Sequence, residues 1–507
     1  MKNLILSLIL LILAGTIQSQ TVQINGVRGK DFRGVKSIED KGFYTFYFSE
    51  RAGKGMIEYV LELYDLDLNL IKKVPMQVRK TALMKGGEFN GKDFLFYFID
   101  LNKKTNTFFV IDDQGNIVKE ETVPNKKIAT AMSTRIFPAS DGSGFYVTQS
   151  VKEKKWGYQI QKVDRDMQVM WEKTYSRDKG WAGISVAESG NGRLVIISLE
   201  KPSLMSKKVM GKVVAFDDRS GDKIYEYELY NGELTAQPTS FLIEDDGTVV
   251  TAGMYFDGMK WVSTNSDGVF FLKLKPNGDK EIFNAIDWDN GIQDALKATS
   301  RKFSIGSKPK VVFHEIIQSP DGGYQVVSET FRKTVKAGTV LGAMGGGGQA
   351  PPMGFTVMDY IIFNYDDQGN PVDINKIEKP YKSALVDGNI ASAGGVALAY
   401  YMKQFKMFTY EFETELENGD KAIVYTNFED AKLGTGNPYL GITTINKGEE
   451  SKTEKRPLSK KYAAYLAGSA ANLKLGALKA KPGKVCMYFF DKKKKAINLV
   501  LEDLTMN

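Results

Sequence analysis

Short apolar runs alternate with turns rich in aspartate, asparagine and glycine along almost the whole chain. Residues 108–118 and 362–372 share the turn sequence Asp-Asp-Gln-Gly-Asn, which follows an aromatic or β-branched run and leads into another. This pattern predicts two antiparallel strands joined by a tight turn. Looser copies of the same hairpin occur at residues 64–67, 163–166, 216–218, 274–278 and 445–448.

A second kind of hairpin lies upstream of these, at turn glycines that lead into aromatic or β-branched runs. The glycines are Gly42, Gly91, Gly144, Gly192, Gly247, Gly323, Gly419 and Gly483. Their successive intervals are 49, 53, 48 and 55 residues, and then 76, 96 and 64 where insertions lengthen the repeat. Four short strands per repeat, with no competing run of convincing helices, predict an all-β fold. We expect a single β-propeller of about eight four-stranded blades.

The two ends of the chain fit one closed ring. After Gly483, strands are predicted at 485–490 and 496–502, and the last blade is then one strand short. We expect residues 21–27 to supply this outer strand, which would remove two exposed sheet edges. Residues 20–507 then form one propeller domain with insertions at 284–309, 330–354 and 381–404. Seven blades is the alternative if residues 381–418 are an insertion.

Two units resemble known propeller repeats. Residues 214–225 are similar to the tryptophan-docking repeat of pyrroloquinoline-quinone-type propellers, with its alanine, aspartate and glycine at Ala215, Asp217 and Gly221. Ser220 stands where that family usually has threonine, and Tyr225 where it has tryptophan. Residues 163–175 are similar to another common propeller strand pair. The resemblance implies the fold rather than quinone chemistry, and the whole chain looks like uncharacterised secreted bacterial propellers.

The first nineteen residues predict export. A lysine at position 2 precedes an apolar stretch from Leu4 to Ala14, and small and polar residues follow. This is the pattern of a secretory signal peptide over residues 1–19, and its apolar run is too short to span a bilayer comfortably. We therefore expect the mature chain, without a transmembrane helix, in the periplasm, at the cell surface or outside the cell. Nucleic acid is not an expected partner there.

The single cysteine and the single histidine limit the chemistry. Cys486 lies in the apolar run 485–490 and is predicted to be a buried strand residue that cannot form an intrachain disulfide. His314 lies in a predicted strand at 311–317. One histidine excludes zinc sites built from several histidines and leaves only this residue for a histidine-based triad. A structural or surface role is predicted for it.

Long connections gather on one predicted face. In a four-stranded blade, the loops between strands 2 and 3 and the crossings between blades lie opposite the short Asp/Gly turns. The strand 2–3 loops carry 19 basic and 9 acidic residues, a net charge of +10, whereas the whole chain carries +7 from 68 basic and 61 acidic residues. These loops are residues 49–55, 99–107, 150–157, 200–211, 256–268, 330–354, 427–438 and 490–496.

A basic and elaborated face predicts binding of an anionic partner, and an acidic glycan, a lipid phosphate or an acidic protein fits it. Ordinary solvated lysines are the alternative. Met344 and Met353 are predicted to belong to an apolar tip on the glycine-rich loop, which lacks the Gly-Lys-Ser/Thr ending of a phosphate loop. The candidate ligand-binding residues are Trp156, Lys207, Lys208, Trp261, Arg332, Lys333, Lys336, Met344, Met353, Lys492, Lys493, Lys494 and Lys495.

Asp287, Asp289 and Asp294 resemble an acidic calcium loop, although the run is one residue short of the pattern D-x-D-x-D-G-x-x-D. Calcium needs about six to eight oxygen ligands, so an ordinary acidic turn is the alternative. No other cofactor is expected, and no catalytic constellation is recognisable. The sequence thus predicts a non-catalytic ligand- or protein-binding propeller of the bacterial cell envelope. A secreted polysaccharide hydrolase or lyase acting on the same face is the alternative.

Overall fold

The fold is seen in a computed structural model of the chain. The predicted signal peptide, residues 1–19, and much of the predicted insertions lie outside the residues that it describes. The described residues are 20–27, 32–38, 40–49, 52–125, 133–152, 156–203, 206, 208–259, 266–294, 310–319, 321–334, 353–386, 395–404, 406–416, 418–429, 437–446, 448, 450–458, 475–491 and 493–504.

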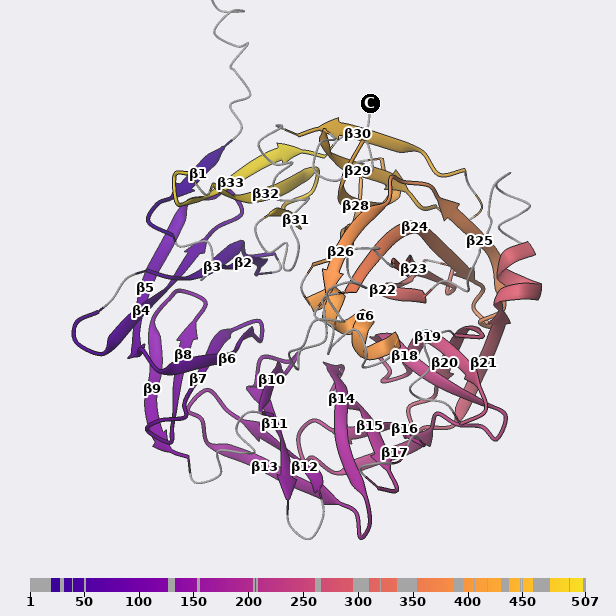
Figure 1. Ribbon diagram of the computed structural model, residues 1–507, viewed down its shortest axis with the longest axis horizontal. Coiled ribbons are helices and arrows are strands. Elements are labelled where there is room, and N and C mark those ends of the chain that lie inside the picture. The colour runs from indigo at the N-terminus through magenta and orange to yellow at the C-terminus, as the bar shows by residue number, and fades with distance from the viewer. Residues whose placement is uncertain are drawn as a thin grey trace, which may run out of the picture.

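Antiparallel strands make up almost all of the regular structure, and their sheets are arranged in a ring (Figure 1). The first strands in the chain are β1 (Thr21–Ile24), β2 (Phe32–Ser37), β3 (Phe43–Phe48), β4 (Met56–Tyr64), β5 (Leu70–Arg79), β6 (Ala82–Phe89), β7 (Asp93–Asp100), β8 (Thr105–Asp112), β9 (Ile117–Pro124), β10 (Arg135–Pro138), β11 (Phe145–Lys152), β12 (Trp156–Val163), β13 (Val169–Ser176), β14 (Trp181–Gly190), β15 (Arg193–Lys201), β16 (Met210–Asp217) and β17 (Lys223–Glu228). The remaining elements are β18 (Leu234–Ile243), β19 (Val249–Asp257), β20 (Gly268–Leu274), β21 (Lys280–Asp287), the π-helical turn η1 (Trp288–Ile292), β22 (Lys310–Gln318), β23 (Tyr324–Thr334), β24 (Met353–Tyr365), β25 (Pro371–Ile377), β26 (Lys382–Val386), α6 (Gly395–Gln404), β27 (Tyr410–Glu415), β28 (Lys421–Phe428), β29 (Pro438–Thr444), β30 (Thr453–Pro457), β31 (Leu475–Lys479), β32 (Lys484–Asp491) and β33 (Ala496–Asp503).

The strands pair in repeated units of four. Separate four-stranded sheets are formed by β2–β5, β6–β9, β18–β21 and β27–β30, and β26 adds a fifth strand to β22–β25 by pairing with β24. The units β10–β13 and β14–β17 share one eight-stranded sheet because Trp156 and Trp181 form a single parallel pairing between them. This repetition confirms the predicted all-β, propeller-like architecture.

The Asx turns that the sequence repeats close the outer hairpins. Asp112 Oδ1 accepts a hydrogen bond from the backbone N–H of Asn116 at 2.7 Å, and Asp366 Oδ1 accepts the equivalent bond from Asn370 at 2.7 Å. Gly115 and Gly369 adopt φ of +78° and +69° in these two turns, a backbone conformation that glycine tolerates and other residues resist. The predicted hairpins at these positions are therefore confirmed, with their aspartates and glycines in defined roles.

Strands from both ends of the chain share one sheet, in the order β1-β33-β32-β31. Thr21 lies opposite Val500 and Ile24 opposite Ile497, as expected for an N-terminal outer strand. A buried apolar cluster joins this sheet to β2–β5, and it includes Phe43 and Tyr488. An ion pair between Lys481 and Asp67 links the same two sheets, so the first and last units lie side by side in the ring (Figure 1).

Neighbouring units pack face to face, and small residues make room for large ones. The ring of Trp171 on β13 lies where a Cβ on Gly221 would be, 2.5 Å from Trp171 Cδ2. Tyr225 on β17 covers Gly278 of the following sheet in the same way, with 2.4 Å between its Cγ and the position of a Cβ. An aromatic side chain on the outer strand of one unit thus packs on a turn glycine of the next.

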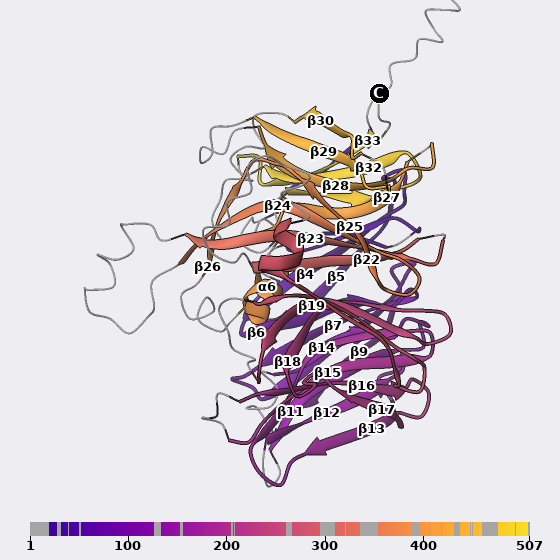
Figure 2. The ribbon, with the colours of Figure 1, turned by 90° about the vertical axis from the view of Figure 1, so that its right-hand side faces the viewer.

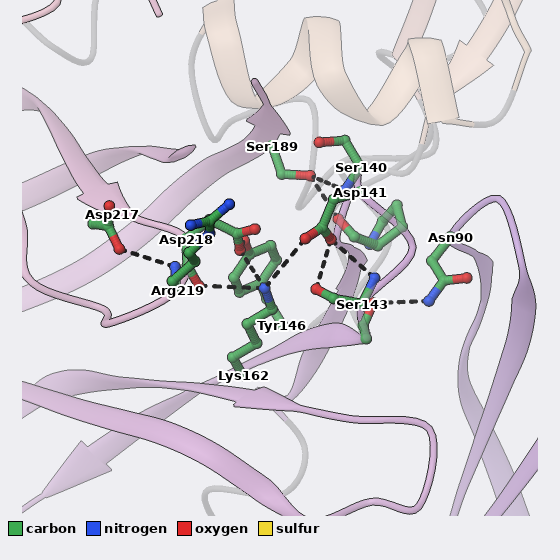
Figure 3. A network of polar contacts seen from close by, with 12 residues as sticks. Asn90, Ser140, Asp141, Ser143, Tyr146, Lys162, Ser189, Asp217, Asp218 and Arg219 are labelled. Carbon is green, nitrogen blue, oxygen red and sulfur yellow. Dashed lines mark hydrogen bonds and ion pairs between the residues drawn. The ribbon is translucent and has the colours of Figure 1, made fainter. Parts of the chain in front are cut away.

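A buried polar network holds the β10–β13 and β14–β17 units together (Figure 3). Lys162 Nζ on β12 lies 2.6 Å from Asp218 Oδ1 and 4.0 Å from Asp141 Oδ2. Tyr146 donates its hydroxyl hydrogen to the same oxygen of Asp218, and Trp171 Nε1 donates to the Asp218 carbonyl at 2.9 Å. Lys162 is only 1% exposed. Its charge is matched inside the interface, which gives this network a structural role.

Two elements differ from the sequence-based expectation. The segment 381–404, predicted as a plain insertion without convincing helix, contains β26 and the ten-residue helix α6. Leu398, Ala399 and Met402 of α6 are buried against a cluster that includes Phe331 and Phe355. This burial stabilises a helix of ten residues, because isolated helices shorter than about 12–15 residues are only marginally stable. The predicted insertion at 284–309 begins later than expected because β21 continues to Asp287.

Cys486 is buried in β32 as expected, and burial raises the pKa of its thiol to about 12.

A membrane-crossing helix is not found in the described part of the chain, where every helix is too short or too polar to span a bilayer.

Candidate functional site

The predicted ligand-binding residues lie at the ends of second and third strands in four different units. Because the units run around the ring with the same strand order from centre to rim, these strand ends share one face, which we call the loop face (Figures 1 and 2). Trp156 begins β12, Lys208 lies between β15 and β16, Arg332 and Lys333 lie near the end of β23, Met353 begins β24, and Lys493, Lys494 and Lys495 lie between β32 and β33. Lys207, Trp261, Lys336, Met344 and Lys492 lie outside the described residues.

Charge is separated between the loop face and the opposite turn face. Counted strictly between the observed second and third strands, and so over shorter ranges than those predicted from the sequence, the loops contain seven basic and two acidic described residues, a net charge of +5. The turns between strands 1 and 2 and between strands 3 and 4, which form the turn face, contain seven basic and 18 acidic described residues, a net charge of −11. This asymmetry creates a field that attracts anions to the loop face.

Lys310 adds to the positive charge of the loop face. It begins β22 opposite Phe331, and Lys333 is two residues further along β23, so the two side chains project from the same side of the sheet. Burial lowers the pKa of Lys310, and the positive charge of Lys333 lowers it further. Two neighbouring ammonium groups at a strand end suit an anionic ligand. Sequence reasoning missed Lys310 because the pairing register is needed to place it beside Lys333.

Two of the predicted ligand-binding residues already contact other side chains of the protein. Lys152 Nζ lies 5.7 Å from the centre of the Trp156 ring, a cation–π contact between paired residues of β11 and β12. Met353 packs against the apolar cluster beneath α6 instead of projecting with the loop tip as expected. The difference arises because β24 already begins at Met353 and pairs with β26.

The acidic segment after β21 forms the cap of a helical turn. Asp287 Oδ1 accepts hydrogen bonds from the backbone N–H groups of Asp289 at 2.7 Å and Asn290 at 3.0 Å, and Asp294 lies just beyond η1. Within the described ranges, no three His, Cys, Asp or Glu side chains gather closely enough to hold a metal ion. Calcium binding by Asp287, Asp289 and Asp294 stays a prediction.

Helix α6 lies near the centre of the ring, over the inner strands (Figure 1). Lys403 Nζ donates hydrogen bonds to the carbonyl oxygens of His314 at 2.9 Å and Phe313 at 3.4 Å on β22. Tyr410 on β27 donates its hydroxyl hydrogen to Glu315 Oε2 on β22, so this hydrogen bond joins the inner strands of two units. Burial raises the pKa of Glu413, and the charge of Glu315 raises it further. Acidic, phenolic and cationic groups therefore meet on the inner strands.

A buried polar cluster joins β22 and β23 to the start of β27. The Glu329 carboxylate lies 2.8 Å from Lys379 Nζ and 3.1 Å from His314 Nε2, and it accepts a hydrogen bond from Thr409 Oγ1 at 2.7 Å. Burial alone would raise the pKa of Glu329, but Lys379 and His314 lower it to about 2. Burial lowers the pKa of His314 despite the opposing charge of Glu329. The only histidine of the chain is thus a structural residue, as expected.

Several solved structures match most of the chain, but with low sequence identity and low structural similarity. The WD40 domain of SCAP from fission yeast has 9% sequence identity and a TM-score of 0.40, covering 95% of this chain and 98% of that one. A europium-containing methanol dehydrogenase has 10% identity and a TM-score of 0.40, covering 92% and 84%. An oligogalacturonate lyase in complex with manganese has 11% identity and a TM-score of 0.38, covering 91% and 97%.

No curated protein matches the sequence. A family model does match, over residues 1–505, and its description is Family of unknown function (DUF6770). The four-stranded units, the loop face and the inner-strand residues described above all fall within that range. This chain belongs to the DUF6770 family.

Proposed function

We propose that this chain is an exported, non-catalytic β-propeller of the bacterial cell envelope whose loop face binds an anionic ligand. An acidic glycan, a lipid phosphate or an acidic protein region fits that face. The pattern of residues 1–19 supports export. Eight four-stranded blades in a closed ring are part of the proposal. The pairing of β1 with β33 and the ion pair between Lys481 and Asp67 support this closure.

The separation of charge carries the binding proposal. A net charge of +5 in the described strand 2–3 loops faces away from a net charge of −11 in the described turns. Lys310 and Lys333 add a pair of ammonium groups. Burial and the positive charge of Lys333 lower the pKa of Lys310, and a bound anion would relieve the repulsion between the two charges. Binding sites commonly lie on loops that a rigid scaffold presents, and the ring of sheets is such a scaffold.

An array that presents acidic and neutral glycans beside anionic and zwitterionic lipids tests the proposal with the mature chain. We expect binding to acidic glycans or anionic lipids, and weaker binding as salt rises because the screening length falls from about 10 Å at 0.1 M to about 3 Å at 1 M. Equal binding to neutral and acidic members of each class, unaffected by salt, would refute an electrostatic loop face.

A polysaccharide hydrolase or lyase is the second candidate, and the inner-strand residues favour it. Glu413 has a raised pKa beside Glu315, and Tyr410 contacts the same carboxylate. A carboxyl group whose pKa is raised beside a second carboxyl group suits general acid–base chemistry. Cleavage of an acidic polysaccharide that is lost in Glu413→Gln and kept in Glu415→Gln, an exposed neighbour on β27, would support this candidate over the first.

A further inference from the structure

Four residues of the loop face lie in one row across the sheet that joins the β10–β13 and β14–β17 units. Lys152 at the end of β11 pairs with Trp156 at the start of β12. Trp156 pairs in turn with Trp181 at the start of β14, and Trp181 with Lys201 at the end of β15. Side chains of paired residues on neighbouring strands project from the same side of a sheet. The order across these four strands is therefore lysine, tryptophan, tryptophan, lysine.

Glycines beside the two tryptophans let the strands come together at this row. A Cβ on Gly157 would lie 2.0 Å from a carbonyl oxygen of β13, and a Cβ on Gly180 would lie 1.9 Å from a carbonyl oxygen at the end of β15. Gly183 leaves room for the Trp181 ring, whose Cζ2 lies 2.4 Å from the position of a Cβ there. The backbone is thus shaped to set the two tryptophans side by side.

The side chains of the row are open to solvent. Trp156, Trp181 and Lys201 are partly exposed and Lys152 is exposed, whereas Trp171, which packs between the same two units, is only 8% exposed. Lys152 Nζ lies 5.7 Å from the centre of the Trp156 ring. Such a cation–π contact is weak at an exposed site, so the lysine can leave the ring for a ligand.

The nearest acid along β15 does not oppose the charge of the row. Glu200 precedes Lys201 and therefore projects from the opposite side of the strand. It is 4% exposed there, and its carboxylate pairs with Arg177 at 2.5 Å and with Lys212 at 3.5 Å. The negative charge of Glu200 is thus matched on the other side of the sheet.

The spacing of the row distinguishes between anionic ligands. Neighbouring strands lie ~4.8 Å apart, so the outer two of the four strands are separated by about 14 Å. A lipid phosphate carries its charge at one point and reaches one end of such a row. An acidic glycan carries carboxylate or sulfate groups at intervals along a chain of rings, and the apolar faces of those rings suit flat aromatic side chains.

We propose that the row of Lys152, Trp156, Trp181 and Lys201 binds an acidic oligosaccharide. Sugar rings pack on the two indoles, and carboxylate or sulfate groups of the same chain pair with the lysines at the two ends. The inference rests on the anion-binding loop face proposed above and names an acidic glycan as its ligand. It also adds Trp181, which the sequence pattern did not single out, to the binding residues.

Calorimetric titration of the full mature chain with tetrasaccharides of heparin, hyaluronan and alginate tests the inference, and at least one of them should bind. Trp156→Ala and Trp181→Ala should each weaken that binding by about 10-fold, because truncating a central aromatic contact removes much of the binding energy. Melting temperatures check that the variants fold. Trp156→Leu and Trp181→Leu replace any alanine variant that unfolds, because leucine keeps an apolar side chain but not a flat ring.

Tyr381→Ala is the matched control, because Tyr381 is 43% exposed and precedes β26 on the loop face, outside the row. It should leave tetrasaccharide affinity unchanged. Equal weakening by the tyrosine and tryptophan variants would overturn the inference, as would unchanged affinity in the tryptophan variants.

Poly-L-glutamate and vesicles of phosphatidylglycerol are the anionic probes without sugar rings. Binding of either one, without binding of any tetrasaccharide, would overturn this inference and leave the anion-binding loop face standing. Binding of none of these probes would overturn both.

Discussion

Glu329 keeps its negative charge in the interior because every oxygen of its carboxylate is matched. Lys379, His314 and Thr409 surround it, and the residue has no exposed surface. The cluster connects strands from two neighbouring sheets, so its energy depends on the sheets staying together. Removing one partner from such a cluster would leave a buried charge unmatched, which is strongly destabilising.

His314 should make stability depend on pH in a range where few other groups titrate. Its folded-state pKa lies below the 6.5 that is usual for a histidine side chain, so below about pH 6.5 the unfolded chain takes up a proton before the folded chain does. The free energy of unfolding should therefore fall as pH drops through 6.5, by up to ~1.4 kcal/mol per pH unit. Urea unfolding between pH 7.5 and 5.5 measures this slope.

His314→Gln is the control, because glutamine keeps a polar group beside Glu329 but does not titrate. The variant should show a flatter dependence of unfolding free energy on pH than the parent protein. Since the chain has a single histidine, the difference between the two curves isolates this residue. Parallel curves for parent and variant would show that His314 does not titrate differently on folding.

At the scale of elements, the hairpins were predictable and the additions were not. Aspartate and glycine at fixed turn positions mark a hairpin through local hydrogen bonds, such as those from Asp112 and Asp366, so the sequence alone located these turns. Helix α6 depends on distant residues of β22, β23 and β24 that bury its apolar side. No local pattern carries that information, and the same holds for the pairing of β26 with β24.

The packing of an aromatic residue on a turn glycine of the next unit can be tested by comparing two glycines. Gly221 and Gly192 both have positive φ, at +69° and +73°, but only Gly221 lies under a ring, that of Trp171. Gly192→Ala should cost the ~1–2 kcal/mol of a strained backbone. Gly221→Ala should cost ~2–4 kcal/mol because Trp171 must also move.

Urea unfolding of both variants measures the difference in free energy. A Cβ on Gly192 meets no atom within 4 Å, so this variant reports the backbone term alone. Equal destabilisation in the two variants would mean that the Trp171 ring does not need the space that Gly221 leaves beneath it.

At the scale of the whole molecule, the sequence predicted which face is basic, and the structure adds how far the two faces differ. Loop composition and strand order were enough to predict the basic face, since the place of a loop in the repeat decides the face on which it lies. The sequence could not predict that Lys310 and Lys333 lie close together, because their proximity depends on the register between β22 and β23.

Retention of the mature chain on a heparin column, compared between two triple variants, tests the central claim most directly. Lys208→Glu, Lys493→Glu and Lys494→Glu reverse three charges on the loop face, and Lys275→Glu, Lys280→Glu and Lys452→Glu reverse three exposed charges at the turn face. Both sets change the net charge equally. At ~0.5 kcal/mol for each exposed charge pair, the loop-face variant should bind heparin about 10-fold more weakly than the turn-face variant. Equal elution of the two variants would contradict an anion-binding loop face.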